Sequence, residues 1–186
     1  MKGNLFAISA PSGCGKTTIL KNIFKIFPDI YFSISATTRP KRDNEIDGKD
    51  YFFITREEFD EYLKKDEFVE WNEHFGNRYG TLKSNIEAHL KKGEDIIFDV
   101  DVNGALNIKK CYPEAITIFI KPPDIKELEN RLKKRGTETE DSIRIRLNRA
   151  KEEIEKSVFF DYIIVNDDLD KAINEVKDII LKYKRG

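Results

Sequence analysis

Along most of this chain, short apolar runs alternate with segments in which apolar residues recur at helical spacing. Short, mostly apolar runs, which are typical of buried strands, lie at residues 5–8, 95–101, 115–120 and 162–166, and the run at 95–101 ends in acids. Between these runs, apolar residues recur three or four positions apart, as in Ile19, Ile23 and Phe27, which is the spacing of a helix that packs by one face. Strands that alternate with helices are typical of a parallel sheet. The pattern therefore predicts an α/β fold.

The pattern changes over residues 33–90. Strand-like runs at residues 30–35, 51–54 and 68–75 surround one short helix, for which Thr55 is the predicted N-cap and Glu58 its capping-box partner. We expect this region to form a small inserted α+β subdomain. A second change follows at residues 131–158, where two helices rich in charged residues flank a polar tip and predict a helical hairpin.

The segment between the first strand and the first helix predicts a phosphate-binding loop. Its sequence is Ala10-Pro11-Ser12-Gly13-Cys14-Gly15-Lys16-Thr17-Thr18, which matches G-x-x-x-x-G-K-[ST] except that Ala10 replaces the first glycine. Glycines let backbone N–H groups turn toward phosphate oxygens, and the start of the helix adds the positive end of its dipole. We expect Lys16 to contact the β- and γ-phosphates, the Thr17 hydroxyl to ligate Mg²⁺ and Ala10 to keep a negative φ. The alternative is an ordinary glycine-rich turn before a helix.

The composition limits the partners of such a site. With 186 residues and 39% hydrophobic content, the chain suits one globular domain. A net charge of -1 provides no overall basic field for nucleic acid, and no stretch reads as a signal peptide or a membrane span. We therefore expect a cytoplasmic protein that binds anions locally. Cys14 and Cys111 lack the spacing of a metal site and are weak candidates for a disulfide.

Two pairs of charged residues are candidates for binding metal or a second phosphate. Asp99 and Asp101 end the predicted strand at 95–101, where an acid holds Mg²⁺ in phosphate-loop enzymes or simply caps the next helix. Arg39 and Arg42 lie three residues apart in a loop stiffened by proline. They form either a fork for a phosphate, because guanidinium groups bind phosphate oxygens bidentately, or a solvated basic loop.

The predicted hairpin and the strand-like run at residues 68–75 add further candidates. Arginines at positions 131, 135, 144, 146 and 149 make the hairpin either a lid that closes over phosphates or a solvated pair of helices. Glu70 lies among apolar residues, where a carboxylate needs a partner. It is either a surface acid or the acceptor for a ligand with adjacent N–H donors. Tyr79 is either part of that site or a core tyrosine.

Eight motifs, in order along nearly the whole chain, resemble those of guanylate kinases. Besides the phosphate loop, they are Ser35-Ala36-Thr37-Thr38-Arg39 through Arg42, Gly48-Lys49-Asp50-Tyr51, Glu67-Phe68-Val69-Glu70-Trp71, Gly76-Asn77-Arg78-Tyr79-Gly80, Asp99-Val100-Asp101, Arg135-Gly136-Thr137-Glu138 and Val165-Asn166-Asp167-Asp168. The resemblance implies an enzyme of purine nucleotide metabolism that transfers the γ-phosphoryl group of ATP to GMP, giving ADP and GDP, with Mg²⁺. It implies a three-layer P-loop kinase fold with a core at 1–32, 91–130 and 160–186, a GMP-binding insert at 33–90 and a helical lid at about 131–158.

The resemblance also implies roles for individual residues. The GMP phosphate would be bound by Arg39, Arg42, Tyr51 and Tyr79, and guanine would be read by Ser35, Glu70, Thr81 and Asp99. ATP would be bound by residues 10–18, Arg131, Arg135, Arg146 and Asn166, the last beside the adenine. Thr17 and Asp101 would share Mg²⁺. The catalytic residues would be Lys16, Arg39, Arg135 and Arg146.

Two differences from the family pattern concern the loop after Arg39. Pro40 stands one position earlier than the proline of the usual Arg-x-Pro-Arg, and Asn44 takes a place commonly held by glycine. Two other functions stay open from the sequence, namely a scaffold domain without catalysis and a kinase for another acceptor such as a sugar phosphate. The intact phosphate loop disfavours the scaffold, and Glu70 favours a nucleobase in the acceptor. A monomer and a homodimer both fit the sequence.

Overall fold

The computed structural model describes residues 2–74, 76–134 and 139–184, in which the strands form two separate sheets. The larger sheet has five strands in the order β2-β7-β1-β8-β9, and all of its strand pairings are parallel. Its strands are β1 (Leu5–Ser9), β2 (Tyr31–Phe32), β7 (Ile96–Asp99), β8 (Ile116–Lys121) and β9 (Tyr162–Val165). All four apolar runs of the sequence contribute strands to this sheet.

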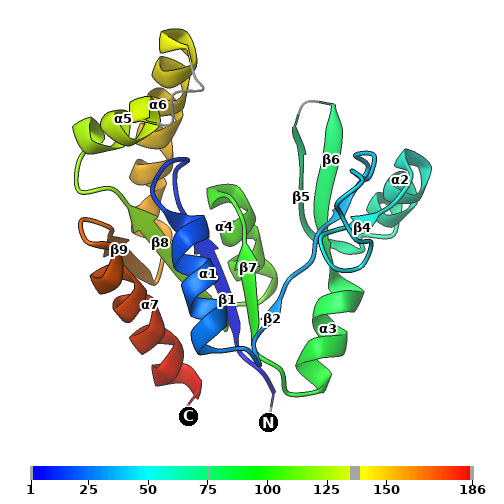
Figure 1. The fold of residues 1–186 in the computed structure, drawn as a ribbon. Helices are drawn as coiled ribbons and strands as arrows, with labels where there is room; N and C mark the ends of the chain where they lie inside the picture. The colour runs from blue at the N-terminus through cyan, green and yellow to red at the C-terminus, as the bar shows by residue number, and fades with distance from the viewer. Residues whose placement is uncertain (1, 75, 135–138, 185–186) are drawn as a thin grey trace.

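Helices cover both faces of the larger sheet (Figure 1). They are α1 (Lys16–Ile26) and α7 (Leu169–Lys184) on one face, and α3 (Lys83–Lys91) and α4 (Val102–Cys111) on the other. Successive side chains of a strand point to opposite faces, so Ile8 of β1 packs with the first pair of helices and Ala7 with the second. This arrangement confirms the predicted α/β fold with a parallel sheet between helical layers.

A smaller, mixed sheet lies beside the larger one, with strands in the order β4-β3-β6-β5. Its strands are β3 (Ala36–Thr37), β4 (Phe52–Phe53), β5 (Phe68–His74) and β6 (Asn77–Leu82). Helix α2 (Arg56–Lys64) packs against this sheet through Phe59, whose ring stacks on Phe68 with 4.3 Å between centroids. Thr55 caps α2 and forms the predicted capping box with Glu58.

The chain passes from the larger sheet to the smaller one through residues 33–35. The single strand predicted over residues 30–35 is wrong here, because β2 ends at Phe32 and β3 begins at Ala36. The Ser33 N–H still donates to the Ile97 carbonyl of the larger sheet at 2.9 Å, whereas the Ser35 carbonyl accepts from Phe52 of the smaller sheet at 3.0 Å. A local pattern cannot show that neighbouring residues pair with different sheets.

Helices α5 (Ile125–Lys134) and α6 (Glu140–Glu155) form the predicted hairpin. They lie on the opposite side of the phosphate loop from the smaller sheet (Figure 1). Leu128 and Ile143 of the hairpin pack in one buried cluster with Cys14 of the loop. Arg135, predicted as a catalytic residue, lies outside the described residues. No helix in the part of the chain that the structure describes could span a membrane.

Candidate active site

The loop between β1 and α1 has the backbone conformation of an anion-binding site. Gly13 and Gly15 have φ values of 98° and 87°, a region that residues with a side chain avoid. Gly15 is the N-cap of α1 and no side chain of the described residues caps it, so the first N–H groups of the helix are directed at a ligand site. A Cβ on Gly15 would lie only 2.6 Å from Asn166 Nδ2. Among the described residues Asp66 is the one non-glycine residue with positive φ, so Ala10 has the predicted negative φ.

The Lys16 side chain reaches from α1 to the end of β7. Its Nζ lies 2.6 Å from Asp99 Oδ1 and donates a hydrogen bond to the Val100 carbonyl at 2.9 Å. The two charged side chains are 19% and 31% exposed, so water screens this ion pair only in part. Asp99, which the resemblance assigns to guanine, is therefore paired with the lysine of the phosphate loop in this structure.

Asp101 caps the helix that follows β7. Its Oδ1 accepts a hydrogen bond from the Gly104 N–H at 2.8 Å, and Asp101 is the N-cap of α4. Its second oxygen, Oδ2, lies 3.9 Å from Arg149 Nη2 on the hairpin. Helix capping, one of the two roles that the sequence left open, is therefore present, and it occupies one oxygen of the carboxylate.

A cleft of about 920 Å³ opens between the phosphate loop and α6. Residues 10–18 line one side of it, and α6 contributes Arg146, Arg149 and Glu153. Arg146 Nη1 donates a hydrogen bond to Ser12 Oγ at 3.0 Å. Burial raises the pKa of Glu153, and its hydrogen bond from Arg149, 2.9 Å long, acts in the opposite direction. Two arginines of the hairpin thus face the phosphate loop.

A second cavity, of about 340 Å³, adjoins the same loop. Its lining residues are Gly13, Gly15, Thr18, Arg131, Asn166, Asp167 and Leu169. Asn166 Nδ2 donates to the Cys14 carbonyl at 2.8 Å, and Arg131 Nη2 donates to the Asn166 carbonyl at 3.0 Å. These bonds tie the loop, the residue after β9 and α5 together. Arg131 and Asn166, both predicted to bind ATP, therefore line one cavity.

Glu70 is a buried carboxylate on β5. It is 7% exposed, and Thr81 Oγ1 donates a hydrogen bond to its Oε1 at 2.6 Å. Burial raises the pKa of Glu70 more strongly than the Thr81 hydrogen bond lowers it, and the charge of Asp101 raises it further. A Cβ on Gly104 would lie 3.2 Å from Glu70 Oε2 and 3.4 Å from Asp101 Oδ1. The acid of the smaller sheet and the acid that follows β7 thus flank the same glycine.

Arg39 lies beside two tyrosines and a carboxylate. Its guanidinium carbon is 5.5 Å from the centre of the Tyr51 ring, and the Tyr51 and Tyr79 ring centres are 6.0 Å apart. Hydrogen bonds with Glu45 and, secondarily, with Tyr79 raise the pKa of Arg39. Three of the four residues predicted to bind the GMP phosphate are therefore close together. Arg42 is exposed on the adjoining turn.

Sequence reasoning missed two acids that pair with arginines of the site. Glu45 binds Arg39, and it follows Arg42 by three residues, the spacing of a tight turn. Glu153 binds Arg149 four residues earlier on α6, the spacing at which helical side chains meet. Both spacings were visible in the sequence. Ser35, predicted to contact guanine, is half-buried in the crossing between the two sheets.

Known proteins with similar sequences and structures place the chain in one family. The family model described as guanylate kinase matches residues 2–183. A guanylate kinase of Thermotoga maritima is 48% identical over 180 residues, which cover 97% of this chain and 87% of the relative. One from Carboxydothermus hydrogenoformans is 46% identical over 183 residues, or 98% and 90% of the two chains. The crystal structure of guanylate kinase from Anaplasma phagocytophilum aligns with a TM-score of 0.71 and 31% identity over 98% of this chain and 86% of that one. The chain therefore belongs to the guanylate kinase family.

Proposed function

We propose that this chain transfers the γ-phosphoryl group of ATP to GMP, giving ADP and GDP, with Mg²⁺ as its cofactor. The observation that carries the proposal is the position of Gly104 between Glu70 and Asp101. Glu70 belongs to the smaller sheet, whereas Asp101 faces the phosphate loop across the cleft. This closeness supports a site in which an acceptor held by the smaller sheet meets a donor held by the loop.

The acceptor site is proposed from the buried acid and the cluster around Arg39. An ionised Glu70 can accept from both N1–H and the exocyclic amine of guanine, a pair of donors that adenine lacks. Adenine in this site would leave a buried carboxylate unpaired, which supports discrimination of ~10⁴. Ser35, Thr81 and Asp99 would complete the contacts to guanine. The phosphate would be held by Arg39, Arg42, Tyr51 and Tyr79.

The donor site is proposed from the phosphate loop and the hairpin. The backbone N–H groups of residues 10–18 and the Lys16 ammonium would bind the ATP phosphates. Arg131, Arg135 and Arg146 would neutralise these phosphates from the hairpin, and Asn166 would lie beside the adenine. The 3.0 Å contact between Arg146 and Ser12 supports this role, because it already brings the hairpin to the loop.

Lys16 and Asp99 would exchange partners when the substrates bind. In this structure each compensates the charge of the other at 2.6 Å. A polyphosphate on the loop offers Lys16 more negative charge than one carboxylate does, and the N–H groups of guanine offer Asp99 new hydrogen bonds. The ion pair therefore keeps both groups compensated until each reaches its own substrate.

The residues present fit a magnesium ion bound mainly through the nucleotide. Thr17 and Asp101 bring a hydroxyl and a carboxylate oxygen to the cleft, and Mg²⁺ prefers such donors. The described residues contain no group of three or more His, Cys, Asp or Glu side chains that could hold a metal by themselves. Magnesium commonly uses one or two protein groups together with substrate phosphates and water. When bound, it neutralises charge on the transferring phosphoryl group.

The task of the protein in this mechanism is positioning and charge neutralisation. The GMP phosphate is already an ionised nucleophile, so the reaction needs no general base. Arg39 and the two tyrosines would direct a phosphate oxygen in line with the γ-phosphorus, while Lys16 and the hairpin arginines would offset the repulsion between two polyanions. Closure of the hairpin would exclude water, which otherwise competes as the acceptor.

The test is coupled ADP release with ATP and Mg²⁺, offering GMP, AMP, UMP and CMP in parallel. We expect strong turnover with GMP alone. Lys16→Ala should lower turnover by ~10³ or more with an unchanged circular dichroism spectrum, because it removes a fixed cation from the phosphates. Lys21→Ala, at an exposed lysine of the same helix, should keep wild-type turnover. Comparable turnover with several acceptors, or normal turnover in Lys16→Ala, would contradict the proposal.

The cellular setting is part of the same proposal. ATP and GMP are small metabolites of the cytoplasm, so we propose a cytoplasmic location. All of the residues named for the site come from one chain, so a monomer and a homodimer could each carry it. Size-exclusion chromatography with light scattering distinguishes the two.

A further inference from the structure

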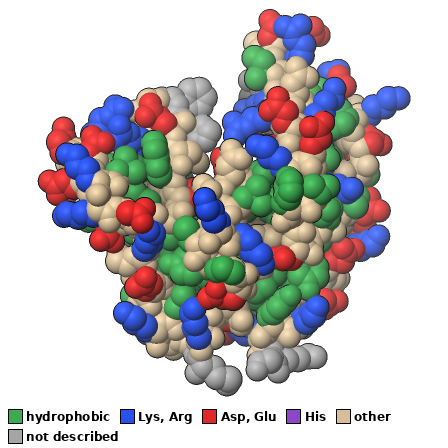
Figure 2. Space-filling model, turned by 180° about the vertical axis from the view of Figure 1, so that it is seen from behind, with side chains coloured by type: hydrophobic (Ala, Val, Ile, Leu, Met, Phe, Trp, Pro, Cys, Tyr) green, Lys and Arg blue, Asp and Glu red, His purple; other side chains and the backbone are tan. Residues whose placement is uncertain are grey.

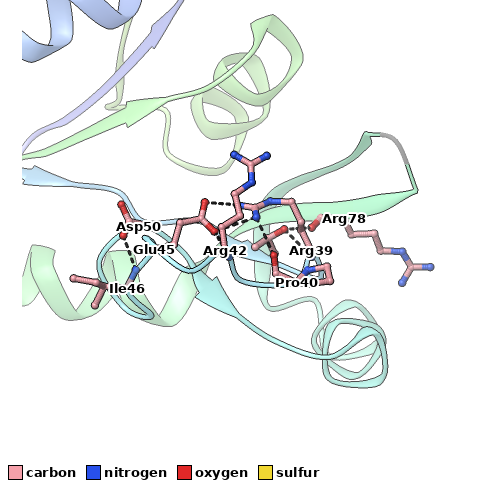
Figure 3. A network of polar contacts seen from close by, with 8 residues as sticks. Arg39, Pro40, Arg42, Glu45, Ile46, Asp50 and Arg78 are labelled. Atoms are coloured by element: carbon pink, nitrogen blue, oxygen red, sulfur yellow. Dashed lines mark hydrogen bonds and ion pairs between the residues drawn. The ribbon is translucent and has the colours of Figure 1, made fainter.

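Glu45 uses both of its carboxylate oxygens inside the loop that carries Arg39. Oε1 accepts from Arg39 Nη2 at 2.6 Å, and Oε2 accepts from Arg39 Nη1 at 3.0 Å and from the Arg42 N–H at 2.8 Å. The Arg39 and Glu45 side chains are only 15% and 13% exposed. Figure 3 shows the carboxylate and the guanidinium pointing toward each other. Arg39 lowers the pKa of Glu45, so the pair is ionised at neutral pH.

This pairing determines which edge of the guanidinium can meet a ligand. Glu45 takes one N–H from each Nη atom, and the Pro40 carbonyl accepts from Nη1 at 2.9 Å. A guanidinium has five N–H groups, so two of them, on the Nε side, are used by neither Glu45 nor Pro40. The Tyr51 ring lies 5.5 Å from the guanidinium carbon and limits its movement further. Arg39 therefore presents a defined edge instead of a freely rotating charge.

The loop itself is held by polar bonds and not by a core. Residues 40–44 and 46–50 are all exposed, including Ile46, the one apolar side chain other than Pro40 in these ranges. The Glu45 N–H donates to the Arg42 carbonyl at 3.1 Å, and the Arg42 N–H donates back to the Glu45 carboxylate. Arg78 supports the base of the loop through its carbonyl, which accepts from Thr37 Oγ1, while its guanidinium pairs with Asp60. Glu45 is thus the residue that joins the fold of the turn to the orientation of Arg39.

We propose that Glu45 is a positioning residue, which orients Arg39 and through it the phosphate of the acceptor. The inference rests on the proposed role of Arg39 in binding the GMP phosphate. Without the carboxylate, Arg39 keeps its charge but loses the two bonds that fix which edge of its guanidinium can meet a ligand. The contribution of the phosphate to GMP binding then falls, whereas recognition of guanine through Glu70 is unaffected. A carboxylate that only stabilised the smaller sheet would affect both equally, and one that only closed the turn would be matched in its effect by Asp50, which closes the next turn of the loop.

Titration calorimetry with GMP and with guanosine, which carries the base without the phosphate, separates these two roles. Glu45→Gln should raise Kd and KM for GMP by roughly 10–100-fold and leave Kd for guanosine and KM for ATP unchanged, because a small misplacement of a phosphate contact has an effect of this size. Glu45→Asp, which keeps the charge, should recover part of the loss. Asp50→Asn is the matched control, since Asp50 Oδ2 closes the next turn of the loop by accepting from the Ile46 N–H at 2.7 Å. It should keep wild-type affinity for GMP.

Arg39→Ala keeps this inference distinct from the proposed function. Normal GMP affinity in Arg39→Ala would overturn the proposed acceptor site, whereas weak binding in Arg39→Ala with normal binding in Glu45→Gln would overturn the positioning role alone. Equal losses of affinity for GMP and guanosine in Glu45→Gln would also overturn the positioning role, as would a loss of GMP affinity in Asp50→Asn equal to that in Glu45→Gln. Support comes from losses that fail to add in the double variant of Arg39 and Glu45, because one residue acts through the other.

Discussion

In the proposed acceptor site, the buried Glu70 would serve recognition of guanine at the expense of stability. Burial raises the pKa of Glu70, so the folded protein binds this proton more tightly than the unfolded chain does. The stability that this difference contributes is present at low pH and is lost as pH rises from the ordinary value of 4.5 through the raised pKa. In its proposed role, however, Glu70 must be ionised, because only the carboxylate accepts two N–H donors from guanine. Folding and the proposed binding of GMP would thus place opposite demands on the same carboxylate.

Glu70→Gln should separate these demands. Glutamine keeps the shape of the side chain and its amide oxygen can still accept from Thr81, but it has no charge to desolvate. We expect the free energy of unfolding of the variant, measured by urea denaturation, to increase relative to that of the wild type as pH rises from 5 to 8. The KM for GMP should rise ~10²-fold or more, because the amide offers guanine one acceptor and a repelling donor. A variant that loses stability relative to wild type as pH rises would contradict the conclusion that burial of the ionised Glu70 destabilises the fold.

At the scale of elements, the spacing of the arginines along helix α6 determines which side of the helix each one lies on. Arg146, Arg149 and Glu153 lie three and four residues apart, so they share the face that lines the cleft. Arg144 lies two residues before Arg146, which places it on a different side of the helix. Its side chain is 77% exposed and pairs with Asp141. The same residue type therefore occurs on one helix both in the cleft and on its outer surface.

This difference gives a matched pair of variants. Arg146→Ala should lower kcat for ATP and GMP by ~10² to 10³, because it removes a cation from the transferring phosphoryl group. Arg144→Ala should leave kcat unchanged, although it removes the same charge from the same helix. Steady-state kinetics, with circular dichroism to confirm the helix content of both variants, is the measurement. Equal losses in the two variants would mean that the net charge or stability of the hairpin, and not contact with phosphate, controls the rate.

The sequence predicted best those elements whose determinants are local. The apolar runs predicted four of the five strands of the larger sheet, and Thr55 with Glu58 predicted the start of α2. Strand β6 was missed because its residues are mostly polar and its place depends on a distant partner. A Cβ on Gly80 of β6 would lie 2.7 Å from Phe68 Cδ1, so glycine there serves contact with another strand.

The same division holds for the candidate site. The phosphate loop could be recognised from its spacing, and Lys16 could be named from it. Its ion pair with Asp99 could not, because it depends on α1 lying beside the end of β7. The Glu45 carboxylate was overlooked because its spacing from Arg42 predicts a turn but does not show that the side chain reaches Arg39. Residue types thus indicate which chemistry a site can carry, whereas the pairing of its side chains depends on the fold.

At the scale of the whole molecule, the charges of the site are carried by three parts of the fold. The larger sheet and its helices carry Lys16 and Asp101, the smaller sheet and its loop carry Glu70 and Arg39, and the hairpin carries Arg146. Figure 2 shows the molecule from behind, hollowed between the part with the smaller sheet and the part with the hairpin. In this state Lys16 pairs with Asp99, and Arg39 pairs with Glu45. Lys16 and Arg39 are thus each compensated within their own part of the fold.

Binding of both substrates should therefore close the molecule. Two polyanions can share the charges of Lys16, Arg39 and Arg146 only if the smaller sheet moves toward the phosphate loop, where Arg146 already contacts Ser12. We expect the radius of gyration, measured by small-angle X-ray scattering, to fall more with GMP plus a non-hydrolysable ATP analogue and Mg²⁺ than with either nucleotide alone. Glu70→Gln at the same GMP concentration should show only the effect of the ATP analogue, because it binds GMP weakly. A radius that does not change when both ligands saturate the wild type would mean that the hollow already has its reactive width, and that exclusion of water must come from side chains alone.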